Sequence, residues 1–351
     1  MITGAAGYLG TVLTEQMLTG DHNVTAVDIG WFPDGAGYLM RLREAHPGRL
    51  TVKRKDVRHL IHEDFSGIDA VFHLAGLSND PMAEYDPESN MDINYWMTLG
   101  AGASARAAGV RLFVFASSAS VYDGCDPATP ATWDDAPDSS PYPYTDAKLK
   151  AESALATIAD DRFSVALFRQ GTLWGVSPRM RYDLVVNTMM RDAMTTGGVT
   201  CVEQEDGTPH MRPICHVADC ARAYGLLLKM FENGNPLPVV RENIVTENVA
   251  ISDVAVSVAD ACETHNHNVG VVYKHVPKVR TYQCQPTSLV TKIYAGRFNL
   301  VGKSAGPGLM ELAKRTYFQS IPSRYDTQTR NIDWFKHIDY VSRLCSGESI
   351  A

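Results

Sequence analysis

The first third of the chain alternates short apolar runs with segments of helical periodicity, the pattern of βαβ units around a parallel sheet. Two of the apolar runs, 70–74 and 112–116, are hydrophobic almost throughout, as expected of strands buried on both faces. Further strands are expected at 23–28 and 50–53, and helices at 11–18 and 92–108. The alternation therefore favours an α/β fold.

After about residue 170 the alternation weakens and becomes a mixture of helical and strand patterns. Helices are expected at 217–231 and 252–263, and a short strand at 243–245. The length of 351 residues suggests about two domains. No linker-like run separates the two halves, so we expect a second domain to be closely attached. Only three residues precede Gly4, and the first strand is therefore either a stub or the remainder of a trimmed one.

Composition and charge exclude several classes of protein. Hydrophobic residues make up 45% and charged residues 21%, which suits a soluble globular chain. The net charge of −8 argues against a broad basic surface for nucleic acid or anionic membrane. Neither a membrane-spanning apolar stretch nor the order of a signal peptide is found. Seven scattered cysteines without a CxxC pair, and no His/Asp/Glu cluster, predict a cytoplasmic protein without a metal site.

Three glycines, Gly4, Gly7 and Gly10, stand where the first strand should turn into a helix. Glycine permits the tight turn and lets backbone N–H groups approach a diphosphate at the positive end of the helix. Asp28 ends the next expected strand, 18 residues after Gly10. A carboxylate there accepts hydrogen bonds from ribose hydroxyls and repels a 2′-phosphate. No arginine follows it directly, so NAD is favoured over NADP.

Tyr144 and Lys148 are four residues apart, a spacing that puts both side chains on one face of a helix. A nearby ammonium stabilises phenolate and would lower the pKa of the tyrosine, which then serves as a general base. Small hydroxyl residues, Ser117, Ser118 and Ser120, end the strand expected at 112–116. Open α/β sheets bind their ligands at that end of the strands.

These features, in this order, resemble the extended short-chain dehydrogenase/reductase superfamily of nucleotide-sugar epimerases and dehydratases. The resemblance covers nearly the whole chain. Two later motifs also match, Arg169 to Gly175 and Arg212 to Asp219, the second as an Arg…His-Val-x-Asp signature. The resemblance implies a Rossmann-type doubly wound parallel sheet with a smaller mixed α/β C-terminal substrate domain. The implied NAD-binding domain is 1–175 with 215–247 returning to it, and the implied substrate-binding domain is 176–214 with 248–351.

The resemblance also implies a cofactor site for NAD built from the ends of successive strands. Its implied residues are Gly4, Ala6, Gly7, Tyr8, Leu9, Gly10, Asp28, Asp56, Val57, Leu74, Ala75, Gly76, Asn94, Ala116, Ser117, Tyr144 and Lys148. In this interpretation His73, inside that set of strands, is a structural residue and not a metal ligand.

The implied catalytic residues are Ser118, Tyr144 and Lys148, with Tyr144 as base or acid. The implied substrate-binding residues are Ser78, Ser118, Ser120, Tyr144, Thr172, Asn187, Arg212 and Arg280. Ser117 and Ser120 also have a structural interpretation. Arg212 is either a diphosphate ligand or the partner of a carboxylate such as Asp219. His216 and Asp219 are interpreted as structural residues.

The residues after Ser118 bear on the type of reaction. Dehydratases of the family carry an acidic pair there, because removing water needs an additional acid and base. Ala119 and Ser120 offer neither, which favours epimerisation of a nucleotide-diphosphate sugar, expected at C4, by transient oxidation to a keto-sugar and return of the hydride. The alternative is an NAD(P)H-dependent reductase or dehydrogenase of a keto-sugar or other small ketone. A non-catalytic dinucleotide sensor is a third hypothesis, disfavoured by the intact Ser–Tyr–Lys set.

Three departures from the family pattern leave the substrate open. Asp123 stands where a glycine is usual, and 77–81 lacks the lysine of UDP-galactose 4-epimerases. Their late Arg-x-Gly-Asp motif is replaced by Arg280-Thr281-Tyr282. The helix at 92–108 and the one starting near Tyr144 resemble the pair through which the family dimerises, so a homodimer is expected.

Overall fold

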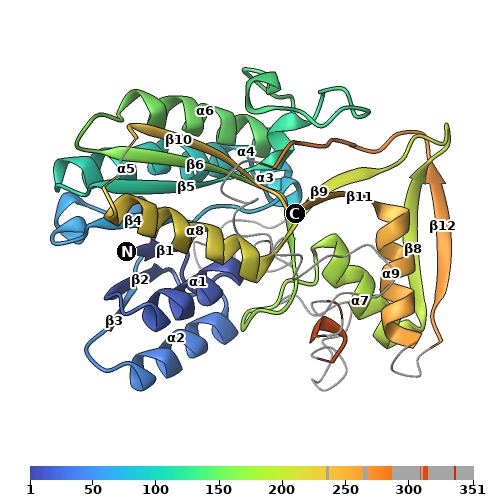
Figure 1. The fold of residues 1–351 in the computed structure, drawn as a ribbon, viewed down its shortest axis with the longest axis horizontal. Coiled ribbons are helices and arrows are strands. Elements are labelled where there is room, and N and C mark those ends of the chain that lie inside the picture. Colours follow the sequence, from blue (N-terminus) through green and yellow to red (C-terminus); the bar gives the residue numbers. More distant parts are fainter. Residues whose placement is uncertain (235–236, 264–267, 287–308, 310, 315–335, 337–351) are drawn as a thin grey trace, which may run out of the picture.

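A seven-stranded parallel sheet forms the larger part of the protein, as the computed structural model shows (Figure 1). The structure describes residues 1–234, 237–263, 268–286, 309, 311–314 and 336. The strands, in spatial order, are β10 (Val239–Ile244), β6 (Ser164–Gln170), β5 (Leu112–Ser118), β4 (Ala70–His73), β1 (Ile2–Thr3), β2 (Val24–Asp28) and β3 (Leu50–Arg54). Every neighbouring pair in this sheet is parallel. The predicted doubly wound α/β class is confirmed.

Helices cover both faces of the sheet (Figure 1). One face carries α1 (Tyr8–Thr19), α2 (Pro33–Ala45) and α8 (Val217–Glu232), and the other carries α5 (Met97–Ala107) and α6 (Pro143–Thr157). The short helices α3 (Asp80–Tyr85) and α4 (Pro87–Met91) pack against α6. Successive side chains of β5 enter opposite core layers, because strand side chains alternate: Val114 packs on the side of α1 and α8, and Phe113 and Phe115 pack on the side of α5 and α6.

The two residues of β1 lie at the centre of the sheet. Ile2 pairs with Ala26 of β2 on one side and with Phe72 of β4 on the other. Strand order reverses at this point, since β2 and β3 lie to one side of β1 and β4, β5 and β6 lie to the other. Ligands of doubly wound sheets bind outside the carboxyl ends of the strands at such a reversal. The fold thus places a binding crevice beyond Thr3 and His73.

The rest of the described chain forms a smaller lobe, on the right in Figure 1. It contains a three-stranded sheet and a two-stranded parallel pair. The first is formed by β7 (Thr172–Trp174), β9 (Met211–His216) and β11 (Glu247–Ala250), the second by β8 (Gly198–Gln204) and β12 (Gly270–Val276); the helices are α7 (Val185–Thr196) and α9 (Ile251–Glu263). After β9 the chain returns to the large sheet as α8 and β10. The domain boundaries implied by the family resemblance stay a prediction, and most of 287–351 lies outside the described residues.

Two expected elements differ in their bounds. The helix expected at 92–108 begins with a π-helical turn, Asp92–Trp96, before α5. Asn94 lies in this wider turn, and its Nδ2 donates to Leu77 O at 2.9 Å and to Asn90 Oδ1 at 2.7 Å. The strand expected at 243–245 starts at Val239, because the whole segment pairs with β6 at the sheet edge. Among the helices that the structure describes, none has the length and apolarity needed to cross a membrane.

Candidate active site

Two adjoining pockets lie at the carboxyl ends of the strands. The cofactor pocket is lined by the glycine turn, Asp28 and the residues after β3 and β4, and the substrate pocket lies beside it around Ser118, Tyr144 and Lys148. Residues that line both pockets are Leu74, Gly76, Leu77, Ser78, Ala116, Gln170, Leu173 and Arg181. A molecule in one pocket therefore meets a molecule in the other.

The glycine turn brings backbone close to backbone at the mouth of the cofactor pocket. Gly4 has a φ of +67°, and a Cβ at this position would lie 2.8 Å from Ala75 N. A Cβ on Gly10 would lie 2.1 Å from Gly4 O, closer than any side chain tolerates. Gly7 precedes α1 and supplies no side-chain cap to its first turn. The N–H groups at the positive end of α1 are thus left for an anionic ligand.

Asp28 is the last residue of β2 and lies next to the glycine turn. Its Oδ2 accepts a hydrogen bond from Ala6 N at 2.9 Å, and its Oδ1 accepts one from Gly30 N at 2.7 Å. Burial raises the pKa of this carboxyl, and the two backbone N–H groups oppose that rise. Each oxygen retains lone-pair capacity for a further donor, as a ribose diol would supply.

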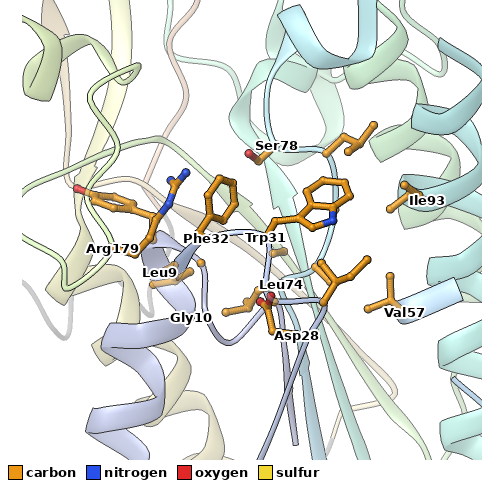
Figure 2. A pocket seen from close by; sticks show the side chains of 18 of the residues that line it. Leu9, Gly10, Asp28, Trp31, Phe32, Val57, Leu74, Ser78, Ile93 and Arg179 are labelled. Carbon is orange, nitrogen blue, oxygen red and sulfur yellow. The ribbon is translucent and has the colours of Figure 1, made fainter. Parts of the chain in front are cut away.

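Apolar side chains form the far end of the cofactor pocket (Figure 2). Trp31, Val57 and Ile93 lie together there, and Phe32 lies beside Arg179 nearer to α1. Asp56 is held by Arg58, whose backbone N and Nε donate to it at 2.9 and 3.0 Å. An apolar slot, a diol-binding carboxylate and an open helix N-terminus in one pocket fit adenine, ribose and diphosphate respectively. The residues present therefore suit NAD.

Most of the predicted cofactor residues line this pocket. They are Gly4, Gly7, Tyr8, Leu9, Gly10, Asp28, Asp56, Val57, Leu74, Ala75, Gly76 and Ala116. Ala6 instead orients Asp28, and Ser117, Tyr144 and Lys148 line the substrate pocket. Asn94 is buried behind Gly76, where a Cβ would lie 2.4 Å from its Oδ1. That oxygen makes no hydrogen bond within the described residues.

Tyr144 and Lys148 project from the first turns of α6, which starts at Pro143. The Lys148 Nζ donates to Ala116 O at 2.9 Å and lies 4.6 Å from the centre of the Phe115 ring and 5.7 Å from that of Tyr144. Burial lowers the pKa of Lys148 to about 8. Since the ammonium is held between a carbonyl and two rings, it is fixed in place beside Tyr144.

The pKa of Tyr144 does not follow the expectation from sequence. Burial raises it to about 12, and the carboxylate of Asp80 adds to the rise. A hydrogen bond with Ser118 and the charge of Arg181 act in the opposite direction. Desolvation outweighs the stabilisation of phenolate in this pocket. The cation that favours the phenolate is Arg181, which the sequence reasoning did not assign.

Five of the predicted substrate residues line the substrate pocket: Ser78, Ser118, Ser120, Tyr144 and Thr172. The Ser118 Oγ accepts a hydrogen bond from Ser120 N at 3.2 Å, and the Ser120 Oγ accepts one from Thr145 Oγ1 at 3.1 Å. Ser117 points the other way and donates to Glu152, which also pairs with Arg169. Ser118 is therefore the serine beside Tyr144, and Ser117 has a structural contact.

Asn187 and the two arginines predicted to bind substrate, Arg212 and Arg280, lie elsewhere. Asn187 is buried in α7, where its Oδ1 accepts from Gly175 N at 3.1 Å and its Nδ2 donates to Tyr8 OH at 3.1 Å. It braces the loop after β7 against α1 and does not line the substrate pocket. This placement gives Asn187 a structural role in the described part of the chain.

Arg280 and Arg212 form a cluster at the edge of the pocket, and neither lines it. Arg280 pairs with Asp80 and Asp123, at 2.8 Å each. Arg212 lies over the Tyr282 ring, 4.8 Å from its centre, and its Nη1 donates to Arg280 O. The alternative interpretation of Arg212 named Asp219 as its partner, but Asp219 pairs with Arg222. Two carboxylates thus already compensate the charge of Arg280.

Arg181 lines both pockets and was missed from sequence. Its Nε and Nη2 bind the two carboxylate oxygens of Asp183 at 3.0 and 2.9 Å, and Asn79 Nδ2 donates to the same carboxylate at 3.1 Å. The signal that could have found it is the pair of arginines at 179 and 181, directly after the motif that ends at Gly175.

His73 and His216, the other candidates for chemistry, are buried structural residues. His73 lies between Thr3 Oγ1 at 3.0 Å and Thr98 Oγ1 at 3.2 Å, and burial lowers its pKa to about 3. His216 caps α8 by accepting from Ala218 N at 3.2 Å. In the part of the chain that the structure describes, no three His, Cys, Asp or Glu side chains gather as a metal site would require.

The fold and these two pockets define an extended short-chain dehydrogenase/reductase. A sequence model of the NAD dependent epimerase/dehydratase family matches residues 1–241, and the chain belongs to this family. NAD is its cofactor.

Known proteins similar to this chain act on nucleotide sugars. UDP-glucose 4-epimerase of Bacillus subtilis (strain 168) is 30% identical over 187 residues, covering 52% of this chain and 54% of the relative. The Streptomyces lividans enzyme of the same name is 25% identical over 65% of this chain and 71% of the relative. The chain spans about half the length of the first curated relatives it matches.

Solved structures cover more of the chain. MoeE5 in complex with UDP-glucuronic acid and NAD is 26% identical with a TM-score of 0.66, over 96% of this chain and 98% of that one. UDP-glucuronic acid 4-epimerase from Bacillus cereus reaches a TM-score of 0.73 at 19% identity, over 90% of this chain and 98% of that one, which shows the fold alone.

Proposed function

We propose that the protein is an NAD-dependent epimerase of a nucleotide-diphosphate sugar, acting at C4 of the sugar. The observation that carries the proposal is the position of Ser118, Tyr144 and Lys148 in a pocket that opens directly into the cofactor pocket. A sugar hydroxyl held by Ser118 and Tyr144 would present its carbon to the cofactor. The similar epimerases and MoeE5, whose complex holds a UDP-sugar and NAD, support this substrate class.

In this mechanism Tyr144 would transfer the proton of the substrate hydroxyl in both directions. The Tyr144 oxygen would accept the proton of the substrate hydroxyl as the carbonyl forms, and would return it when the carbonyl is reduced on the other face. Ser118 would hold the same oxygen by a hydrogen bond, while Lys148 would fix the ribose side of the site and Arg181 would favour the phenolate. NAD supplies the hydride acceptor and donor when it is bound.

Epimerisation is favoured over loss of water by the residues that follow Ser118. Ala119 is buried and Ser120 is engaged by Thr145, so β5 contributes no carboxylate to the pocket. Asp80 is the carboxylate that lines the pocket beside Tyr144, and Arg280 pairs with it at 2.8 Å. This ion pair engages the carboxylate that the removal of water would otherwise use as an additional acid or base.

The experiment is incubation of the purified protein with a panel of UDP- and dTDP-sugars in D₂O, followed by proton NMR. Epimerisation by direct hydride return gives the 4-epimer with hydrogen, not deuterium, at C4, and gives no net NADH. Products that have lost water would instead identify a dehydratase. Steady consumption of added NADH or NADPH would identify the alternative, a keto-sugar reductase. The Ser118→Ala variant, which removes one hydroxyl that would hold the reacting oxygen, should slow the formation of the 4-epimer.

We further propose a homodimer that forms through α5 and α6. Gly100 and Ala103 on α5 are exposed, and Trp96 just before it is 54% exposed. Small exposed residues let two helices approach closely, and an exposed indole gains from being covered. Light scattering after size exclusion tests the assembly, and Ala103→Arg should yield monomers. A monomeric wild-type protein at micromolar concentration would contradict it.

A further inference from the structure

Tyr282 is a second phenol in the wall of the substrate pocket, which it lines together with Ser118 and Tyr144. It comes from the segment after β12, whereas Ser118 ends β5 and Tyr144 belongs to α6. The residue is 8% exposed. The three hydroxyl groups therefore reach one pocket from three separate segments, and a sugar held by Ser118 and Tyr144 would meet Tyr282 as a further polar group.

The ring of Tyr282 is fixed by groups that do not line the pocket. The guanidinium carbon of Arg212 lies 4.8 Å from the ring centre, and the backbone N of Tyr282 donates to Met211 O at 3.4 Å. In the same segment, Thr281 Oγ1 accepts from Met211 N at 2.9 Å and donates to Pro209 O at 3.1 Å. Since both the ring face and the backbone are engaged, the phenol is positioned before a ligand binds.

The residues that follow Tyr282 tie this segment to the larger lobe. Ala131 N donates to Gln283 O at 3.0 Å, and Gln285 N donates to Ala131 O at 2.8 Å. Asn243 of β10 donates through its Nδ2 to Gln285 O at 2.8 Å. Contacts from both lobes thus hold the segment that carries Tyr282 at the substrate pocket.

The Tyr282 hydroxyl is protonated at neutral pH and can donate a hydrogen bond. Burial raises the pKa of Tyr282, and the charges of Arg212 and Arg280 oppose that rise. No hydrogen bond joins this hydroxyl to a residue of the described chain. A largely buried phenol usually has a hydrogen-bond partner, because leaving the group unpaired costs free energy. In the wall of a pocket, a ligand oxygen can be that partner.

The neighbouring hydroxyl groups indicate which oxygen Tyr282 would bind. Ser118 and Tyr144 share a hydrogen bond, whereas Tyr282 acts on Tyr144 only through its charge. The hydroxyl of Tyr282 therefore does not converge with the other two on a single point. It faces a different part of a sugar that fills the pocket.

We propose that Tyr282 is a further substrate-binding residue, whose hydroxyl donates to a sugar oxygen other than the one held by Ser118 and Tyr144. The inference rests on the proposed function, because it assumes a sugar in this pocket. A second anchor limits rotation of the sugar about the first one and so orients the reacting carbon. Tyr282 would position the sugar without taking part in the proton transfer.

The test is equilibrium binding of UDP, UDP-glucose and UDP-4-deoxyglucose to the full-length protein with NAD bound, measured by calorimetry. Tyr282→Phe removes the hydroxyl and keeps the ring beside Arg212, so the fold should be preserved. We expect this variant to bind both sugar nucleotides about 3- to 10-fold more weakly, the range of one neutral hydrogen bond. Its affinity for UDP, which has no sugar, should change less than about twofold by the same reasoning.

Two further variants sharpen the comparison. Ser118→Ala should weaken the binding of UDP-glucose but not of UDP-4-deoxyglucose, which lacks the hydroxyl that Ser118 would hold. Tyr142→Phe is the matched control, because the Arg280 guanidinium carbon lies 4.0 Å from the centre of the Tyr142 ring, yet Tyr142 does not line the pocket. It should leave all three affinities unchanged.

An unchanged affinity of Tyr282→Phe for UDP-glucose would overturn the inference. An equal loss for UDP would show a structural role, and a loss confined to UDP-glucose would show that Tyr282 binds the same hydroxyl as Ser118; either result would also overturn it. The expected losses in a protein that forms no 4-epimer would refute the proposed function alone. A wild-type protein that does not bind UDP-glucose would contradict both.

Discussion

The cofactor pocket and the substrate pocket share a wall, yet their polar groups are held in different ways. In the cofactor pocket, backbone N–H groups and one carboxylate, Asp28, are fixed by hydrogen bonds within the first 30 residues. In the substrate pocket, charges arrive from distant segments and compensate one another, as in the cluster of Arg280 with Asp80 and Asp123. Local spacing therefore defines the glycine turn and Asp28 in the first pocket, and long-range charge pairing defines the ion pairs beside the second.

This difference indicates which polar groups remain able to bind a ligand. A distant side chain could accept hydrogen bonds from the backbone N–H groups at the end of a strand only by occupying the pocket itself. An arginine at the edge of a pocket can be compensated by protein groups, and the two arginines predicted to bind substrate are engaged in this way: Arg280 pairs with Asp80, and Arg212 donates to Arg280 O. Arg181, although bound to Asp183, is the guanidinium that lines both pockets and acts on Tyr144.

The largest expected effect is at Tyr144, the proposed general base, which belongs to the substrate side of the comparison. Tyr144→Phe should lower kcat about 10³-fold, within the range of a lost general base, while the bound NAD is retained. Turnover is measured by NMR, and NAD by its release from denatured protein. Wild-type turnover in this variant would exclude the proton transfer assigned to Tyr144.

Gly10→Ala should disrupt the cofactor side without a charge being changed. The added Cβ would lie 2.1 Å from Gly4 O, so the turn must shift. We expect a destabilisation of about 1–3 kcal/mol in urea unfolding and loss of retained NAD. Gly37→Ala is the control: the nearest atom to that Cβ is the flexible end of Arg41, at 3.8 Å, and alanine should stabilise α2 by up to about 1 kcal/mol. Unaltered NAD binding by Gly10→Ala would show that the backbone turn is not the anion site.

Substitutions of Arg181 and Arg280, the two arginines near the substrate pocket, should differ in their effect on kcat/KM. Arg181→Met should lower kcat/KM about 30-fold, roughly 2 kcal/mol, and Arg280→Met less than about tenfold, because only Arg181 lines the pocket. Arg181 lowers the pKa of Tyr144, so its removal raises that pKa. The limb of the kcat/KM profile that rises with pH should then move to higher pH. A larger effect of Arg280→Met would contradict this order and favour Arg280 as a substrate-binding residue.

The smallest expected effect is on the pH dependence of the unfolding free energy. It arises at His73, a neutral buried side chain beneath the cofactor pocket, and not at the ion pairs beside the substrate pocket. His73 has a folded-state pKa lowered to about 3, so the unfolded chain binds its proton first as the pH falls below 6.5. Its contribution is complete above that pH and declines towards pH 3. Between pH 7.5 and 5.5, the wild-type unfolding free energy should fall about 1.4 kcal/mol more than that of His73→Gln.

The predictions from sequence succeeded where an element and its chemistry are adjacent in the chain. The glycine turn and Asp28 lie at the ends of β1 and β2 as expected. In a βαβ unit the two strands are parallel neighbours, so their carboxyl ends lie side by side. The helix at 92–108 was predicted without its π-helical turn, since the bonds of Asn94 to Leu77 and Asn90 depend on packing.

The sequence by itself predicted the α/β class from its alternating pattern and the nucleotide crevice from the glycine spacing and Asp28. The set of Ser118, Tyr144 and Lys148 was predicted from the resemblance to a known family, supported by the four-residue spacing of Tyr144 and Lys148. Only the tertiary structure decided which arginine faces the substrate pocket. It engaged Arg280 with two carboxylates, placed Asn187 in the core and brought Arg179 and Arg181 from the smaller lobe to the large sheet. The physical reason is that a charge is attracted by every opposite charge within reach, and those partners are known only once distant segments are packed together.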